Sequence, residues 1–221
     1  MFVGDDVVDL AQVSRPSHVA ARFEQRVLSS AERMRLEAAP DRGRMLWRLW
    51  TAKEAAFKAA CKHASGLRFD HARFEVECDG AHGRVRHPDI ELAVRWAEGP
   101  DWVHAVAFRV EPCRWDAAVA PLAILLSELG TLTEEELSTA PHADSRAARV
   151  LAHRLLGGLG APEGLLVTRT GGPPEVRRAR RPTRDAASLG VAKEVAWDVS
   201  LSHDGRFVSA VAAGLDGSEE R

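Results

Sequence analysis

The sequence predicts an α+β fold made of two halves of similar size, and two observations support this prediction. Helical periodicity gives way to strand-like alternation twice along the 221 residues. The hydrophobic content of 45% is enough for one large domain or two small ones of about 100 residues each. We therefore expect one half in residues 1–112 and the other in residues 113–221, divided near Pro112.

The first half is expected to begin with a strand, "VGDDVVDL", that carries acidic residues. Ser29 with Glu32 three residues later is the capping-box signal of a helix start. Apolar side chains then recur at steps of three and four from Trp47 to Cys61, which predicts a longer helix over about residues 43–62. Farther on the period changes to two, and "ARFEVEC", "IELAVRW" and "WVHAVAFRV" are predicted as antiparallel strands.

The second half is expected to return to helix or loop in "DAAVAPLAILLSEL". Thr133 with Glu136 forms another capping box. The segment "DSRAARVLAHRLLGGLG" predicts an amphipathic helix capped by Asp144 or Ser145. The remaining segments are predicted from their turn residues: a hairpin in "GLLVTRTGGPPEV", a solvated loop from Arg177 to about residue 187, and two strands in "WDVSLSHDGRFVSAVAAG" joined at His203-Asp204-Gly205.

Composition narrows the class of protein. A net charge of −2 gives no general attraction to nucleic acid or membranes. The three cysteines are widely spaced and form neither a metal-binding pattern nor a disulfide framework, so a reducing compartment is expected. The N-terminus lacks the basic region of a signal peptide, and the longest apolar run, "AAVAPLAILL", is too short to span a bilayer. We expect a cytoplasmic protein with no membrane or nucleic-acid partner.

Three of the four lysines of this arginine-rich chain lie in one stretch, "WRLWTAKEAAFKAACK", at Lys53, Lys58 and Lys62. Glu54 falls on the aromatic face of the same predicted helix. A carboxylate there is costly to bury unless it is paired or coordinates a metal. Two interpretations stay open: a Glu54–Lys58 pair on the helix edge, which contributes about 0.2–0.5 kcal/mol, or a catalytic or metal-binding glutamate.

Two further polar clusters lie at the edges of apolar elements. One contains Asp5, Asp6 and Asp9, and the other contains Ser202 and His203. Taken singly, the first is typical of a solvated strand end and the second of an exposed turn. Taken together with Glu54 and its lysines, they suit phosphoryl transfer, because carboxylates hold Mg²⁺ while Lys and His side chains bind phosphate oxygens. The sequence contains no GxxxxGK[ST], GxGxxG, GxSxG, HExxH or paired CxxC motif.

At these residues the chain resembles the two-half, Sfp-like type of the 4′-phosphopantetheinyl transferase superfamily. The matching stretches are "VGDDVVDL", "WTAKEAAFKA" and "VSLSHDGRFVSAVAA", with weaker likeness in "SRAARVLAHRLL" and "GLRFDHARFEV". The resemblance implies two pseudo-symmetric halves, each a helix-packed antiparallel sheet, with the active site at their interface. It also implies transfer of the phosphopantetheine arm of coenzyme A to a serine of an apo carrier protein, with Mg²⁺ and release of 3′,5′-ADP. Such carriers serve polyketide, nonribosomal peptide or fatty-acid synthesis.

The resemblance assigns expected roles residue by residue. Asp6 and Glu54 are expected to hold Mg²⁺, and Glu54 to help deprotonate the carrier serine. Lys58 is expected to neutralise a phosphate and stabilise the leaving group. Coenzyme A is expected to be bound by four further side chains: Lys53, Arg146, Ser202 and His203. Because both halves lie in one chain, the resemblance implies a monomer.

The chain departs from the pattern of this family in three ways. The halves come in swapped order, with Asp6 and Glu54 first and His203 last. Val8 stands where many two-half members have another acidic ligand, and Asp9 is a doubtful replacement because strand alternation separates it from Asp6. The Gly-Lys-Pro segment of the family is "GGPPEV" here, so its lysine is missing and Arg177 or Arg178 is the expected substitute.

Two other functions remain open at the level of the sequence. The missing lysine and Val8 would also suit a non-catalytic relative that binds coenzyme A or a carrier protein without transfer. The run "RRARRPTR" could bind a nucleic-acid backbone, but it is short and has no interleaved aromatic residues.

Overall fold

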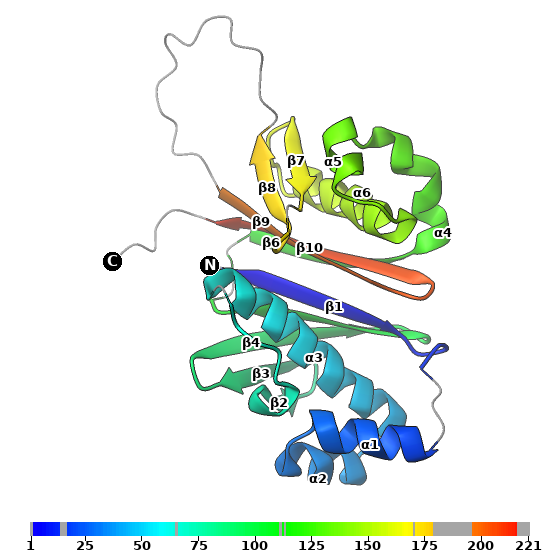
Figure 1. Cartoon of the computed structure of the whole chain (residues 1–221), viewed down its shortest axis with the longest axis vertical. Coiled ribbons are helices and arrows are strands. Elements are labelled where there is room, and N and C mark those ends of the chain that lie inside the picture. Colours follow the sequence, from blue (N-terminus) through cyan, green and yellow to red (C-terminus); the bar gives the residue numbers. More distant parts are fainter. Residues whose placement is uncertain are drawn as a thin grey trace, which may run out of the picture.

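The computed structural model describes residues 2–13, 17–64, 66–110, 112, 114–169, 171–178 and 196–215 of the chain. The molecule is α+β, as the sequence predicts, with helices packed on antiparallel sheets. Its two groups of elements are stacked along the long axis, and β1 faces β9 and β10 where the groups meet (Figure 1). Within the described residues, no helix is both long enough and apolar enough to cross a membrane.

The first group contains a five-stranded antiparallel sheet in the order β1-β5-β4-β3-β2. Its strands are β1 (Val3–Asp9), β2 (Glu75–Asp79), β3 (His82–His87), β4 (Ile90–Glu98) and β5 (Trp102–Phe108). Of these, β1, β2, β4 and β5 were predicted. The sequence analysis missed β3, because "HGRVRH" is short and mostly polar, so its alternation is weak.

Four helical segments accompany this sheet. They are α1 (Ser17–Val27), α2 (Ser30–Ala38), α3 (Arg42–His63) and the short η1 (His71–Arg73). The predicted capping box at Ser29 is present, and the long predicted helix is α3, which packs across β1 and β5. The packed face of α3 carries small side chains: Ala52, Ala55, Ala56 and Ala59 are all fully buried.

The second group contains a three-stranded sheet, β6-β10-β9, and a separate β7-β8 hairpin. The strands are β6 (Arg114–Pro121), β7 (Leu165–Thr168), β8 (Glu175–Arg178), β9 (Ala196–Asp204) and β10 (Phe207–Leu215). The helices are α4 (Leu122–Leu125), η2 (Leu126–Thr131), α5 (Glu134–Ser138) and α6 (Ala143–Gly158).

The structure confirms four predictions in this group: the hairpin, the last two strands, the helix α6 and the capping box at Thr133. Three predictions need correction. The segment before Pro121 is strand β6 rather than helix or loop, because it pairs with β10. The N-cap of α6 is His142, which makes no side-chain cap. Arg177 and Arg178 end strand β8 instead of beginning a loop, and the rest of that predicted loop lies outside the described residues.

The two groups repeat one architecture that sequence identity does not reveal. In each, a strand is followed by a short capped helix, a long helix, a hairpin and two strands. In each, the capping glutamate is buried and accepts a hydrogen bond from the first strand of the hairpin: Val76 N to Glu32 Oε1 at 2.7 Å and Val167 N to Glu136 Oε1 at 2.8 Å. The two groups thus share an equivalent buried hydrogen bond between the capping glutamate and the hairpin.

Side chains join the two sheets where β1 meets β9. Three backbone N–H groups of β1 donate to side chains of β9, each 195 residues farther along the chain: Val3 to Asp198 at 2.8 Å, Asp5 to Ser200 at 3.0 Å and Asp9 to Asp204 at 2.8 Å. These pairs satisfy donors on the outer edge of β1, which would otherwise be buried without partners. The contacts set the register between the halves.

Candidate functional site

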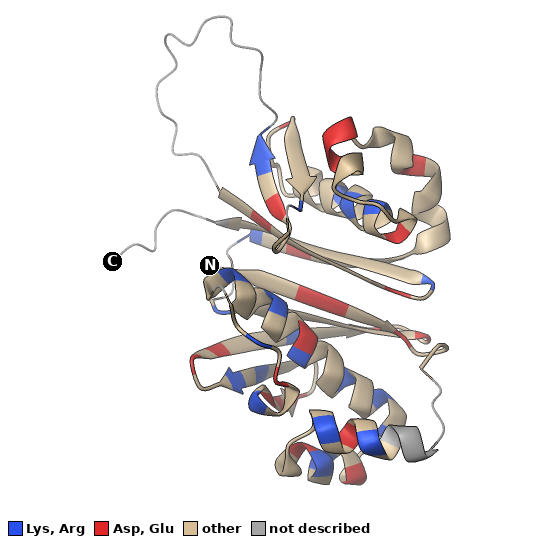
Figure 2. Ribbon diagram, in the orientation of Figure 1, with Lys and Arg blue, Asp and Glu red and all other residues tan. Residues whose placement is uncertain are grey.

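The backbone of β1 passes unusually close to α3, and this close approach builds the site. A Cβ atom on Gly4 would lie 2.1 Å from the carbonyl oxygen of Ala55 and 2.6 Å from the nitrogen of Ala59. Only glycine fits at such a distance. The next residues on the strand, Asp5 and Asp6, are thereby held beside the turn of α3 that carries Glu54 and Lys58. Figure 2 shows an acidic segment on β1, the edge strand of the first sheet that faces the second sheet.

Asp6 is the centre of a hydrogen-bonded group. Its Oδ1 accepts from Lys58 Nζ at 2.9 Å and from Ser202 Oγ at 2.8 Å. Lys58 Nζ also donates to the carbonyl oxygen of Asp5 at 2.8 Å. Asp6 is 8% exposed, so the expectation of a solvated strand end does not hold. One carboxylate therefore ties β1 to α3 of the first half and to β9 of the second.

A pocket of about 410 Å³ opens at this junction, with walls from both halves. The predicted site residues that line it are Asp6, Glu54, Lys58, Ser202 and His203. The other lining residues are Val7, Val8, Val13, Trp47, Trp50, Arg169, Leu201 and Asp204. Glu54 and His203, almost 150 positions apart in the sequence, thus share one pocket. Residues of both halves therefore line the same pocket, as a site between the halves requires.

The carboxyl group of Glu54 lies in an unfavourable electrostatic environment. Burial and the neighbouring charge of Asp6 raise the pKa of Glu54 to about 7, against the opposing effect of Lys58. The ammonium of Lys58 pairs with Asp6 rather than with Glu54, so the helix-edge ion pair considered above does not form. Burial also raises the pKa of Asp6, although Lys58 and Ser202 offset part of this effect. Three carboxyl groups, those of Asp6, Glu54 and Asp204, thus share the pocket with the cations of Lys58 and Arg169.

The three lysines of α3 differ in how many donors they have left. Lys53 Nζ donates to His71 O at 2.9 Å and to Phe74 O at 2.5 Å, and pairs with Glu32 at 2.9 Å. Lys62 Nζ donates to three oxygens on β1 and β9. Lys58 has two acceptors among the described residues. Because an ammonium has three donors, only Lys58 keeps one for a ligand.

Lys53 and Arg146 are therefore not brought to the pocket, although the sequence analysis expected both to bind coenzyme A. Lys53 is fully buried in the core of the first half. Arg146 lies in the first turn of α6, and its Nε donates to the carbonyl oxygen of Ala140 at 2.8 Å. His203 does line the pocket; its Nδ1 lies 3.3 Å from Asp144 Oδ2 and its side chain is 47% exposed.

Asp9 does not line the pocket either. It is fully buried and forms a two-pronged pair with Arg206, from Nε to Oδ2 at 2.8 Å and from Nη2 to Oδ1 at 2.7 Å. Hydrogen bonds from Arg206 outweigh burial and hold the pKa of Asp9 down at about 2. Asp9 therefore clamps the turn after His203 to the end of β1. Among the described residues, no three His, Cys, Asp or Glu side chains form a group that could hold a metal on its own.

Arg169 is the pocket residue that the sequence analysis missed. It follows β7, lines the pocket from the second half, and its Nε donates to the carbonyl oxygen of Gly172 at 2.7 Å. The expected substitutes for the missing lysine lie elsewhere: Arg177 pairs with Glu135, and Arg177 and Arg178 line a different pocket with Pro162 and Trp197. No local signal marks Arg169, because arginines are frequent throughout this chain.

The raised pKa of Glu54 predicts a pH-dependent stability in buffer without divalent cations. Between pH 4.5, the ordinary value, and about 7, the unfolded chain loses this proton while the folded chain keeps it. The folded state then binds more protons, so the free energy of unfolding falls as pH rises through this window. The melting temperature should therefore fall more steeply from pH 5 to pH 7.5 in the wild type than in Glu54→Gln. If the melting temperatures of the two proteins changed with pH in the same way, Glu54 would not be the group with the raised pKa.

Part of the chain is similar to known proteins. Residues 2–107 match the family model described as "4'-phosphopantetheinyl transferase superfamily". Over 74 residues the chain is 46% identical to a holo-[acyl-carrier-protein] synthase of Streptomyces coelicolor, an alignment that covers 30% of this chain and 58% of that protein. The chain thus spans somewhat more than half the length of this relative.

Solved structures of the same kind match about half of the chain. One is an acyl-carrier-protein synthase of Chronobacterium ammoniagenes in complex with CoA, which is 29% identical with a TM-score of 0.38 and covers 48% of this chain and 93% of that one. Another is the holo-[acyl-carrier-protein] synthase of Neisseria meningitidis, which is 19% identical with a TM-score of 0.40 and covers 50% of this chain and 98% of that one.

Proposed function

We propose that the chain transfers the phosphopantetheine arm of coenzyme A to a serine of an apo carrier protein, as expected for a member of the 4′-phosphopantetheinyl transferase superfamily, whose model residues 2–107 match. The observation that carries the proposal is the pocket in which Asp6, Glu54 and Lys58 of one half meet Ser202 and His203 of the other. Residues 1–112 would form the metal-binding half and residues 113–221 the coenzyme A-binding half.

The residues of the pocket fit a Mg²⁺ ion. Asp6 and Glu54 line the pocket together; burial raises the pKa of both, and the charge of Asp6 raises the pKa of Glu54 further. A divalent cation would remove this repulsion. Mg²⁺ is commonly held by one or two carboxylates, with water and substrate phosphates as its other ligands. When bound, it would supply positive charge to the pyrophosphate of coenzyme A.

Glu54 and Lys58 are then suited to the two ends of the transfer. The oxygen of the carrier serine attacks the phosphorus that bears the pantetheine arm, and the bond to the 3′,5′-ADP oxygen breaks. Glu54 would accept the proton of the serine hydroxyl, since its carboxyl group lines the pocket beside Asp6 and Lys58. Lys58 would donate its remaining N–H to the phosphate oxygens as charge develops on the leaving group.

Ser202 acts on Asp6 in this scheme. Its hydroxyl donates to Asp6 Oδ1 at 2.8 Å and is buried, which orients the carboxylate toward the pocket. His203 and Arg169 remain as the second-half groups that face the pocket and can donate to phosphate oxygens. Arg169 would thereby supply the basic group that the segment at Gly172 lacks.

Arg169→Ala should raise the KM for coenzyme A by about 10- to 100-fold, the equivalent of one charge-assisted hydrogen bond. The kcat should change much less, because a contact made equally in the ground state and the transition state contributes uniform binding. Steady-state kinetics with coenzyme A as the varied substrate provide the measurement. Arg177→Ala is the matched control, since Arg177 pairs with Glu135 outside this pocket. Equal effects of the two variants would remove Arg169 from the site.

The proposed function is tested by incubating the protein with coenzyme A, Mg²⁺ and an apo carrier protein and weighing the carrier by mass spectrometry. A gain of one phosphopantetheine group supports transfer. Coenzyme A binding without any gain, across acyl and peptidyl carriers, would favour the non-catalytic relative that the missing lysine first suggested. Omission of Mg²⁺ and substitution of the carrier serine serve as controls.

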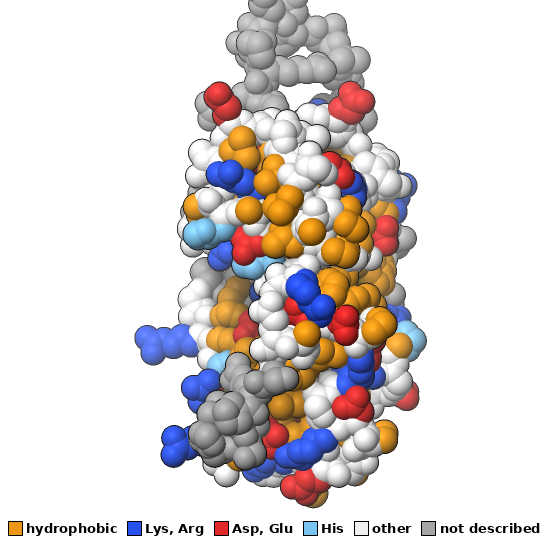
Figure 3. Space-filling model, turned by 90° about the vertical axis from the view of Figure 1, so that its right-hand side faces the viewer, with side chains coloured by type: hydrophobic (Ala, Val, Ile, Leu, Met, Phe, Trp, Pro, Cys, Tyr) orange, Lys and Arg blue, Asp and Glu red, His pale blue; other side chains and the backbone are white. Residues whose placement is uncertain are grey.

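The remaining partner predictions are proposals of the same kind. One chain supplies both walls of the pocket, so we expect a monomer to be active. A nucleic-acid partner is not favoured: on the face in Figure 3, Lys and Arg side chains are scattered among acidic and apolar ones. The basic run "RRARRPTR" lies, after Arg178, outside the described residues.

A further inference from the structure

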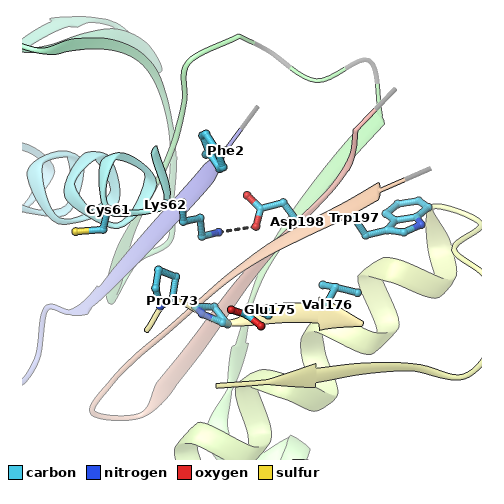
Figure 4. A pocket seen from close by; sticks show the side chains of 9 residues that line it. Phe2, Cys61, Lys62, Pro173, Glu175, Val176, Trp197 and Asp198 are labelled. Carbon is cyan, nitrogen blue, oxygen red and sulfur yellow. Dashed lines mark hydrogen bonds and ion pairs between the residues drawn. The ribbon is translucent and has the colours of Figure 1, made fainter. Parts of the chain in front are cut away.

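Lys62 is a buried cation that the proposed reaction leaves without a role. It lies near the end of α3, and its side chain is 7% exposed. Figure 4 shows it reaching across the junction of the halves to Asp198 on β9, at 2.7 Å. Burial lowers the pKa of Lys62, and the charge of Asp198 opposes this effect. Such a charge is costly to bury unless its partners are well placed.

The partners of Lys62 are distributed over both halves. Its Nζ donates to the carbonyl oxygen of Val3 at 2.7 Å, to Asp198 Oδ1 at 2.7 Å and to the carbonyl oxygen of Val199 at 2.6 Å. The second oxygen of Asp198 accepts the backbone N–H of Val3 at 2.8 Å. All three ammonium donors are used, so Lys62 has none left for a substrate. The cluster forms a closed bridge from α3 through β1 to β9.

Lys62 and Lys58 hold β1 in the same way. They bind the carbonyl oxygens of Val3 and Asp5 respectively. Four residues of helix advance about 6 Å, and two residues of strand advance about 6.8 Å, so the two lysines match alternate carbonyl groups on one edge of the strand. A displacement of β1 at Val3 would therefore be transmitted to Asp5, and so to the carboxylate of Asp6 that follows it.

We propose that the Lys62–Asp198 pair positions the reaction centre, which rests on the proposed function above. It fixes β1 between α3 and β9, and it acts through Asp6 and Lys58 without touching the substrate. Compact ammonium groups suit this task, because each must reach carbonyl oxygens within a narrow space between strand and helix. This role explains why Lys62 accompanies Lys58 in an arginine-rich chain.

The chain offers a matched control for a test. Asp198 and Glu32 each pair with a buried lysine of α3; Asp198 also accepts one backbone N–H group and Glu32 accepts two. Only Asp198 contacts β1; Glu32 lies on α2, in the core of the first half. Asp198→Asn and Glu32→Gln therefore remove the same charge from the same kind of pair. Both variants should melt at lower temperatures than the wild type.

Transfer to an apo carrier protein is then measured while Mg²⁺ is varied, below the melting temperature of every variant. Asp198→Asn should raise the Mg²⁺ concentration for half-maximal rate about tenfold and lower kcat by a similar factor, because small misplacements of reacting groups are costly. Glu32→Gln should keep both values within about twofold of the wild type. If the two variants had the same Mg²⁺ dependence, the positioning role of the Lys62–Asp198 pair would be overturned, and the proposed function would be unaffected. A wild type that transfers nothing would overturn the proposed function, and this inference with it.

Discussion

Glu54→Gln is expected to reduce transfer of phosphopantetheine by about 10²- to 10⁴-fold, the range that a positioned general base contributes. Glutamine keeps the size of the side chain but cannot accept the proton of the carrier serine. It is also a weaker ligand for a hard cation, so two functions are lost together. Single-turnover transfer, followed by the mass of the carrier protein at saturating Mg²⁺ and coenzyme A, provides the measurement.

The fold should survive this substitution. Glu54 has no hydrogen-bond partner among the described residues, and its charge is opposed by burial and by Asp6. The variant should therefore melt at or above the temperature of the wild type near neutral pH. Wild-type turnover in this variant would show that another group takes the proton. A loss of activity together with a lower melting temperature would point instead to a structural role.

Asp6→Asn is expected to lower transfer on the order of 10²-fold and to raise the Mg²⁺ requirement steeply. The substitution removes a carboxylate ligand of Mg²⁺ and, at the same time, the negative partner of Lys58. The amide oxygen can still accept the hydroxyl of Ser202, so the junction between the halves should remain intact. Activity as a function of Mg²⁺ concentration measures the effect.

Asp9→Asn separates this prediction from a general effect of acidic residues on β1. Asp9 is buried in its pair with Arg206 and does not line the pocket. Its substitution should lower the melting temperature, while the Mg²⁺ concentration for half-maximal rate stays near that of the wild type. If Asp9→Asn rather than Asp6→Asn shifted the Mg²⁺ dependence, the metal ligand on β1 would be Asp9.

The predictable part of the fold was the part with strong local signals. The periodicity of α3 and the capping boxes at Ser29 and Thr133 specified helices, because they depend on neighbours within a few residues. The prediction for β6 was wrong for the opposite reason: the strand depends on pairing with β10, from Phe207↔Pro121 to Gly214↔Arg114, which is far away in the sequence. Small apolar residues such as those of "DAAVA" have no strong local preference for either structure.

The site residues divide along the same line. The sequence identified three polar clusters, and the family resemblance selected Asp6, Glu54, Lys58, Ser202 and His203 from them. These five residues line one pocket, whereas the other two predicted residues, Lys53 and Arg146, do not. The acidic residues of β1 could not be ranked from the sequence, because Asp5, Asp6 and Asp9 are equivalent until their partners are known. Burial against His104 and Ser209 for Asp5, and pairing with Arg206 for Asp9, leave only Asp6 at the pocket.

The sequence by itself determined the α+β class, the long helix of α3 and the types of residue that could hold phosphate and Mg²⁺. Only the tertiary structure decided which lysine can act. Lys53, Lys58 and Lys62 have the same chemistry and lie on one helix, but their ammonium groups meet different acceptors. Those acceptors come from η1 and the residue after it, from β1 and from β9, up to 137 residues away. Spacing along the chain specifies the face of a helix, whereas the number of free donors depends on what packs against that face.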